Sequence, residues 1–131
     1  MLRFEWRAPF ANADVKALHA EGFAHGVLDV DWRAQLERHS LGWVCAYDGD
    51  HLIGFVNVAW DGGVHAFVID TLVAGDRRHG GIGRRLLEVV ERESRRAGCE
   101  WLHVDFEEEL GGFYFGACDF TPTTAGVIAL R

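Results

Sequence analysis

The chain has 131 residues, of which 49% are apolar and 12% aromatic, and this composition predicts one globular domain over residues 1–131 rather than a disordered chain. No segment approaches the roughly 18 consecutive apolar residues of a membrane span, so we expect no membrane contact. Because the N-terminal sequence lacks the apolar region of a signal peptide and the cysteines are three, an odd number, we expect a cytoplasmic protein.

The net charge of −7 hides a strong asymmetry along the chain. Residues 77–96 hold seven of the thirteen basic residues and three of the twenty acidic ones, which leaves this window at +4 and the rest of the chain at −11. A protein that is acidic overall binds nucleic acid poorly, because that affinity comes largely from neutralising phosphates. A local basic window is better suited to one compact anionic ligand.

The first third of the chain predicts a strand and two helices. Residues 2–7 alternate as a strand, and the apolar pattern over residues 11–25, with Asn12 at the N-cap position, indicates a helix. A second, shorter helix is predicted over residues 32–38, with Asp31 as its N-cap.

Three apolar runs then predict an antiparallel meander, because short turns rich in Asp and Gly separate them. The runs cover residues 42–47, 51–60 and 64–74, and the turns are Asp48-Gly49-Asp50 and Asp61-Gly62-Gly63.

After the meander the apolar period changes from that of a strand to that of a helix. Ile82, Leu86 and Val90 recur every four residues, and Gly98 follows as a helix stop. Residues 99–106 alternate again as a strand, so this strand would lie parallel to the last strand of the meander, with the helix as the crossover. The remaining predicted elements are a short helix and a final strand, at residues 108–117 and 121–130. The fold class is therefore α+β, built around a mixed sheet.

Three glycines within four positions precede the crossover helix, in the stretch "DRRHGGIGRRLLEVV". Glycines before a helix N-terminus are typical of phosphate-binding loops, because unpaired N–H groups and a partial positive charge point at the ligand. A Walker A loop is excluded because no Gly-Lys-Ser/Thr ends the stretch. The dinucleotide-binding motif fails because Leu86 stands where its third glycine would be. A loop that merely needs unusual backbone angles remains the structural alternative.

Two motifs and the order of the predicted elements resemble the GNAT superfamily of acyl-CoA-dependent N-acyltransferases. Residues 78–83, "RHGGIG", match the family pattern Arg/Gln-x-x-Gly-x-Gly/Ala directly after a strand that ends in Leu72-Val73. Residues 113–120, "FYFGACDF", are similar to the Phe-Tyr…Gly-Phe sequence near the end of that fold. The resemblance covers nearly the whole chain, and it implies a mixed, mostly antiparallel sheet of about six to seven strands flanked by about four helices.

In this family the backbone of the glycine motif cradles the pyrophosphate of coenzyme A. The resemblance therefore implies acetyl-CoA as the co-substrate, bound by Leu72, Val73, Arg78, His79, Gly80, Gly81, Ile82, Gly83 and Arg84. Leu72 and Val73 would pair through their backbone with the pantetheine arm, almost as an added strand. Arg85 could also reach a phosphate, or it could lie solvated on the helix face.

An acceptor amine must lose a proton before it attacks a thioester, which at pH 7 costs an ordinary amine roughly 4 kcal/mol. Family members often place a carboxylate thirteen residues before the motif arginine, and counting back from Arg78 gives His65. An imidazole is a competent base near neutral pH. A β-bulge in this strand would change that count. Asp70 is the second candidate base, and it could instead bond the backbone or pair with an arginine.

Tyr114 matches the family tyrosine that often protonates the leaving thiolate. A phenol with a pKa of ~10 stays protonated at pH 7 and can donate to a thiolate. The interval from Tyr114 to Phe120 is six residues, whereas the family usually has five, and Asp119 stands in place of a glycine. Strict spacing would put Phe115 at the site instead, but the retained Phe-Tyr pair favours Tyr114.

The resemblance implies transfer of an acetyl group from acetyl-CoA to a primary amine of a small molecule or peptide by direct attack. The alternative is a module of the same fold that binds acyl-CoA without turnover, and a mononucleotide- or nucleic-acid-binding domain is more distant. No His, Cys or carboxylate spacing predicts a metal site. Folds of this family often form homodimers through sheet edges or terminal strands. No motif names the acceptor.

Overall fold

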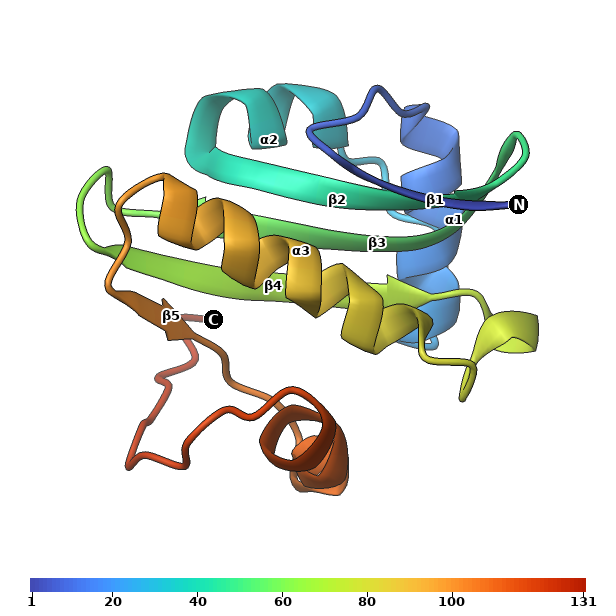
Figure 1. Ribbon diagram of the computed structural model, residues 1–131. Coiled ribbons are helices and arrows are strands. Elements are labelled where there is room, and N and C mark those ends of the chain that lie inside the picture. The colour runs from blue at the N-terminus through green and yellow to red at the C-terminus, as the bar shows by residue number, and fades with distance from the viewer.

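The protein, described by a computed structural model of residues 1–131, is a five-stranded sheet with helices on both faces (Figure 1). The strands are β1 (Leu2–Trp6), β2 (Ser40–Asp48), β3 (His51–Trp60), β4 (His65–Val73) and β5 (Trp101–His103). The α-helices are α1 (Asn12–Gly22), α2 (Trp32–His39) and α3 (Ile82–Arg96). Two 3₁₀ turns (Gly75–Arg77 and Glu108–Leu110) and a π-helix (Gly112–Ala117) complete the secondary structure.

The strands lie in the sheet in their order along the chain, β1-β2-β3-β4-β5. The first four are antiparallel to their neighbours, and β5 alone is parallel to its neighbour, β4. A tight turn can join antiparallel strands, whereas a parallel pair needs a long crossover, which α3 supplies between β4 and β5. The predicted meander and crossover unit are confirmed.

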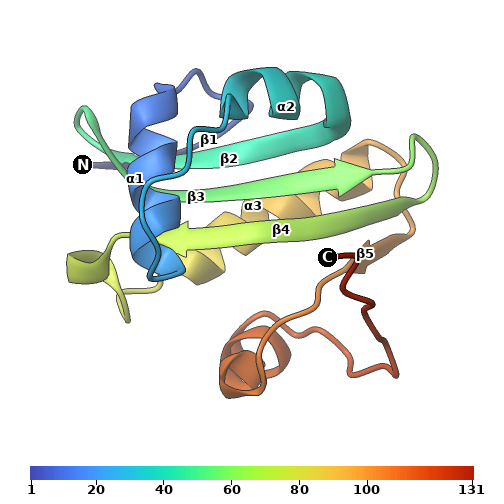
Figure 2. The ribbon, with the colours of Figure 1, turned by 180° about the vertical axis from the view of Figure 1, so that it is seen from behind.

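Each face of the sheet has its own apolar core, because the central strands are buried on both sides. Figure 1 shows α3 crossing one face, and Figure 2 shows α1 and α2 on the other. On the first face Leu86 and Val90 of α3 are fully buried against the sheet. Gly54 of β3 allows this close packing, since a Cβ atom there would lie 3.1 Å from the Ile82 side chain. On the second face Val15 of α1 and its neighbours form the other core.

The helix starts differ in part from the sequence-based expectation. Asp31 caps α2 as predicted, because its side chain accepts a hydrogen bond from the Ala34 backbone N–H at 3.2 Å. The predicted N-cap role of Asn12 is wrong, since Ala11 occupies that position without a side-chain cap. Asn12 instead donates to Asp31 at 2.9 Å and accepts from the Arg33 N–H at 3.0 Å. It thus joins the starts of the two helices.

The predicted count of six to seven strands is wrong, because the sheet has five. Residues 121–131 form no strand, although they return to the neighbourhood of β5 (Figures 1 and 2). The predicted strand over 99–106 is also shorter, since β5 spans only Trp101–His103. Alternation in a sequence is local, whereas a strand needs a partner edge, and such a short β5 offers the last segment little to pair with.

None of the helices is both long enough and apolar enough to cross a membrane.

The packing of α3 against the sheet predicts a large cost for truncating its central side chain. Leu86 is 0% exposed, so Leu86→Ala should lower the free energy of unfolding by about 2–5 kcal/mol, measured by denaturant unfolding. Leu130→Ala is the matched control, because Leu130 is 95% exposed and its truncation should change stability by less than about 0.5 kcal/mol. Equal effects of the two variants would contradict this account of the core.

Candidate functional site

The edge of β4 that faces β5 is paired over only part of its length. Pairing with β5 covers His65–Phe67, opposite Trp101–His103, and β4 then continues to Val73 while the chain after β5 turns away. Residues 68–73 therefore present a strand edge that no other strand occupies. An extended ligand can bond such an edge through its own polar groups.

A β-bulge lies at the middle of this open edge. Phe55 of β3 pairs with Leu72, and Asn57 pairs with Ile69, so two residues of β4 stand opposite one residue of β3. The extra residue is accommodated at Asp70, which has a φ of +56°, in the left-handed region. This is an unfavourable conformation for most side chains, although aspartate tolerates it better than most.

The bulge reverses the alternation of side chains along β4. Before it, Ala66 and Val68 point into the core beneath α3. After it, Leu72 points into the core beneath α1 and α2. In a regular strand Asp70 would share the face of Val68, but the bulge turns it toward α1 instead.

The partner of Asp70 there is a histidine rather than the backbone or the arginine that the sequence suggested. Asp70 Oδ2 lies 3.5 Å from His19 Nε2 of α1, and the two side chains are 23% and 14% exposed. Burial raises the pKa of the Asp70 carboxyl, and the nearby His19 partly opposes this increase. Sequence reasoning missed His19, because only the folded chain brings α1 beside the bulge.

Tyr114 of the π-helix lies across the open edge from the residue that follows the bulge. Its phenol O–H donates to the Thr71 Oγ1 atom at 3.1 Å, and the side chain is buried at 6% exposure. The Phe106 ring stacks on it at 4.5 Å between centroids. Burial raises the pKa of Tyr114, so the phenol keeps its proton at neutral pH.

The π-helix explains how Tyr114 reaches this position despite the unusual spacing of the motif. The Cys118 N–H donates to the Phe113 carbonyl at 2.9 Å, five residues back, so one turn absorbs one more residue than an α-helix would. Asp119 has a φ of +60°, the conformation for which a glycine would be preferred at that position. Phe115 is 42% exposed, and the side chain that reaches β4 is that of Tyr114.

The glycine motif forms the entry into α3. Gly81 is the residue before the helix and has a φ of +82°, and His79 is also left-handed at +65°. The Arg78 side chain donates back to the Val73 carbonyl at 3.3 Å, which holds the loop against the end of β4. At Gly83 a Cβ atom would lie 3.1 Å from the Phe113 ring, so this glycine permits close packing. Unpaired N–H groups of a 15-residue helix therefore point out beside the open strand edge.

The arginines around this loop have different roles. Arg77 is held by Asp48 at 2.6 Å, and Arg84 pairs with Glu88 at 3.3 Å on the exposed surface. The Cζ atom of Arg85 lies 4.0 Å from the centre of the Phe4 ring of β1, which favours a structural role for Arg85. Of the adjacent residues Arg84 and Arg85, Arg84 is therefore the better placed to contact a ligand phosphate.

His65 lies at the other end of β4 from the glycine loop. It is the first residue of the strand, and its Nδ1 atom is 2.8 Å from Nε2 of His103. Asp70 is five positions further along the strand, a distance of about 17 Å at 3.4 Å per residue. The structure thus brings Asp70, Thr71 and Tyr114 to one edge and leaves His65 outside that group.

The raised pKa of Asp70 predicts a pH-dependent stability effect. The folded protein binds this proton more tightly than the unfolded chain, so Asp70 lowers stability as the pH rises from about 3.8 through its higher folded value. Asp70→Asn removes this cost, and its amide can donate to His19. We expect the melting temperature of the variant, relative to the parent, to be higher at pH 8 than at pH 4.

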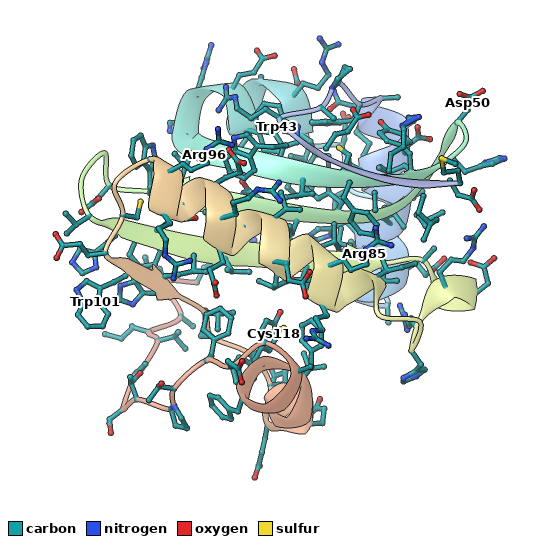
Figure 3. All side chains as sticks on the ribbon, viewed as in Figure 1. Trp43, Asp50, Arg85, Arg96, Trp101 and Cys118 are labelled. Carbon is teal, nitrogen blue, oxygen red and sulfur yellow. The ribbon has the colours of Figure 1, made fainter.

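Asp50→Asn is the matched control, because Asp50 is exposed in the β2–β3 turn (Figure 3). The difference in melting temperature between Asp50→Asn and the parent should be the same at pH 4 and at pH 8. A destabilisation of Asp70→Asn that grows from pH 4 to pH 8 would mean that attraction to His19 outweighs burial.

Comparison with known proteins places this geometry in a family. Residues 4–115 match the sequence model of the Acetyltransferase (GNAT) family. No match was found among curated protein sequences.

Solved structures share the fold over nearly their full length. A GNAT family acetyltransferase from Streptococcus pneumoniae has a TM-score of 0.80 at 23% identity, covering 100% of this chain and 98% of its own. The aminoglycoside N-acetyltransferase AAC(6')-Iy in complex with CoA gives 0.76 at 17% identity, with 100% and 95% covered. Glucosamine-6-phosphate N-acetyltransferase from Arabidopsis thaliana gives 0.74 at 14% identity, with 98% and 99% covered. These similarities confirm the α+β GNAT fold, and with the match over residues 4–115 they show that the chain belongs to the GNAT acetyltransferase family.

Proposed function

We propose that the protein is an N-acetyltransferase that moves the acetyl group of acetyl-CoA to a primary amine of a small molecule or peptide. The observation that carries this proposal is the placement of Tyr114 and Asp70 on either side of Thr71, at the open edge of β4. A proton donor and a proton acceptor thus flank one point of the strand, next to a phosphate-binding loop.

The glycine loop fits the pyrophosphate of coenzyme A. His79, Gly80 and Gly81 are exposed, and the space beside the left-handed Gly81 is open, since a Cβ atom there would have no neighbour within 4 Å. The N–H groups at the start of α3 would bond the phosphate oxygens, and Arg78 and Arg84 would add positive charge. Leu72 and Val73 link this loop to the bulge, and the edge of the strand here, which no other strand occupies, would hold the pantetheine arm. Coenzyme A supplies the activated acetyl group as a thioester.

Asp70 is a better placed base than His65. Its carboxyl lies at the bulge, two residues before Leu72, whereas His65 lies five positions earlier, at the start of the strand. Because burial raises the pKa of Asp70, the carboxylate accepts a proton more readily than an exposed aspartate does. In this proposal Asp70 takes the proton from the acceptor amine before the nitrogen attacks.

Tyr114 is the proposed acid. Its phenol proton would pass to the leaving sulfur atom, and Thr71 holds the hydroxyl group in place until then. A buried phenol that stays protonated at neutral pH suits this role, since it is a donor throughout the working pH range.

The acceptor is proposed as a cationic or amine-bearing small molecule or peptide. The AAC(6')-Iy and Arabidopsis thaliana proteins of the same fold are N-acetyltransferases of an aminoglycoside and of glucosamine 6-phosphate. In this chain the net charge outside residues 77–96 is −11, which favours encounter with a cation.

Two glycines at opposite ends of α3 provide a test of coenzyme A binding. Gly81 and Gly98 have φ values of +82° and +92°, and neither has an atom within 4 Å of a Cβ position. Gly81→Ala and Gly98→Ala should therefore cost similar backbone strain, about 1–2 kcal/mol. Acetyl-CoA at 100 times its Kd should stabilise the parent by about 2.7 kcal/mol in thermal unfolding, and we expect Gly81→Ala alone to lose most of that gain. No shift of the parent at millimolar acetyl-CoA would refute coenzyme A binding.

Turnover is tested by replacing the tyrosine. Thiol release from acetyl-CoA would be measured with a panel of amines, an aminoglycoside and a lysine-containing peptide. Tyr114→Phe should lower kcat by about 10²- to 10⁴-fold and leave the acetyl-CoA thermal shift intact. Tyr47→Phe is the control, because that hydroxyl bonds the Pro9 carbonyl outside the site. Saturable acetyl-CoA binding without acceptor-dependent thiol release in the parent would instead identify a binding module.

A further inference from the structure

Asp70 is the first member of a chain of three polar side chains that leads out of the site. His19 Nε2 lies 3.5 Å from Asp70 Oδ2, and on its other side His19 Nδ1 lies 2.8 Å from His25 Nε2. The last contact joins His25 Nδ1 to the Gly26 carbonyl oxygen. The three side chains come from β4, from α1 and from the segment between α1 and α2, so the chain crosses from the sheet edge to the surface.

Hydrogen-bond chemistry fixes where the protons lie along this chain. The Gly26 carbonyl can only accept, so His25 must carry a proton on Nδ1. In a neutral imidazole the other nitrogen then has no proton, so His25 Nε2 accepts from His19 Nδ1. The remaining nitrogen, His19 Nε2, is left with a lone pair that faces the Asp70 carboxyl. Without a further proton, this lone pair and the Asp70 carboxylate repel each other. A single proton shared between Asp70 Oδ2 and His19 Nε2 replaces that repulsion with a hydrogen bond.

The surroundings of His19 leave Asp70 as its charged partner. The rings of Phe23 and Trp32 lie 4.7 and 5.0 Å from the imidazole centroid and shield it from solvent. The other ionisable groups facing the pair are His25 from the segment after α1 and Tyr114 from the π-helix. Glu21 of α1 is engaged by the Gly75 backbone N–H, and α2 contributes the uncharged Trp32.

We propose that His19 and His25 carry the proton that Asp70 removes from the acceptor amine to the surface between α1 and α2. This inference rests on the proposed acetyl transfer. The N–H bond of the amine breaks as an O–H bond forms on Asp70, and that proton then moves to His19 Nε2. His19 passes its Nδ1 proton to His25 Nε2, and His25 releases its own Nδ1 proton to water. Rotation of the two rings restores the starting tautomers, and no oxidant or further reactant is needed.

The first test observes the protons directly and needs no turnover. Long-range ¹H–¹⁵N NMR distinguishes protonated from bare ring nitrogens, with His51→Gln, His25→Gln and His19→Gln spectra giving the assignments. At a pH where the imidazoles are uncharged, we expect His19 and His25 to carry their protons on Nδ1. His51 is exposed at the start of β3 and should carry its proton on Nε2, as free imidazole side chains in water mostly do. Nε2 protonation of both His19 and His25 would overturn the proposed chain.

The second test is the pH dependence of turnover, with any amine of the panel that supports thiol release. His19→Gln should lower kcat/KM at pH 7 by at least about tenfold. It should also move the acid limb of the profile to lower pH, because the proton that Asp70 and His19 share in the parent is then bound by the Asp70 carboxylate alone. His25→Gln should lower kcat and leave the limb in place, and His51→Gln should change neither. An unmoved limb with kcat within about twofold in His19→Gln would overturn the relay.

The two tests separate the relay from the function on which it rests. If the parent releases no thiol with any amine, the proposed acetyl transfer fails, and the relay fails with it, whatever tautomers the spectra show. If the parent is active and the pH profile and kcat of His19→Gln match those of the parent, the transfer stands and the relay alone is refuted.

Discussion

The site depends on one local irregularity, the β-bulge at Asp70 in β4. A single residue with a φ of +56° reverses the alternation of the strand, so Asp70 turns to α1 while Thr71 meets Tyr114. Without the bulge, Asp70 would point beneath α3, into a core that has no partner for a carboxylate. Such strain persists only where the surroundings fix it, and here β3 pairs with β4 on both sides of the bulge.

The second constraint is the early end of the parallel pairing between β4 and β5. Only three residues of each strand pair, so the half of β4 that leads to the glycine loop keeps a free edge. The start of α3 lies beside that edge, because the eight residues 74–81 that join β4 to the helix fold back on the end of the strand, where Arg78 bonds the Val73 carbonyl. The helix start proposed to bind phosphate and the open strand edge thus lie next to each other, as the proposed binding of a long, thin ligand requires.

The charges near the glycine loop are divided between folding and binding. Arg77 is bonded to Asp48 and Arg85 covers Phe4, so both are engaged in contacts between the loop or α3 and the first strands. The Arg78 side chain closes the loop on Val73, and Arg84 is left at the surface with Glu88. Some arginines of the basic window at residues 77–96 therefore stabilise the fold through contacts within the protein. In the proposed phosphate binding, the backbone of the loop contributes more than the arginine side chains.

The sequence by itself determined the order of the α-helices and of the five strands, the mixed sheet and the glycine loop before α3, because periodicity, Asp-Gly turns and helix-start signals are local. It also identified Asp70 and Tyr114 as candidates. Tertiary structure alone decided which residues these two side chains contact. The pairing of Asp70 with His19 joins residues 51 positions apart, and it requires both a bulge and a helix on the correct face. The π-turn that admits an extra residue after Tyr114, and the absence of a final strand over 121–130, are likewise set by packing partners that no local pattern specifies.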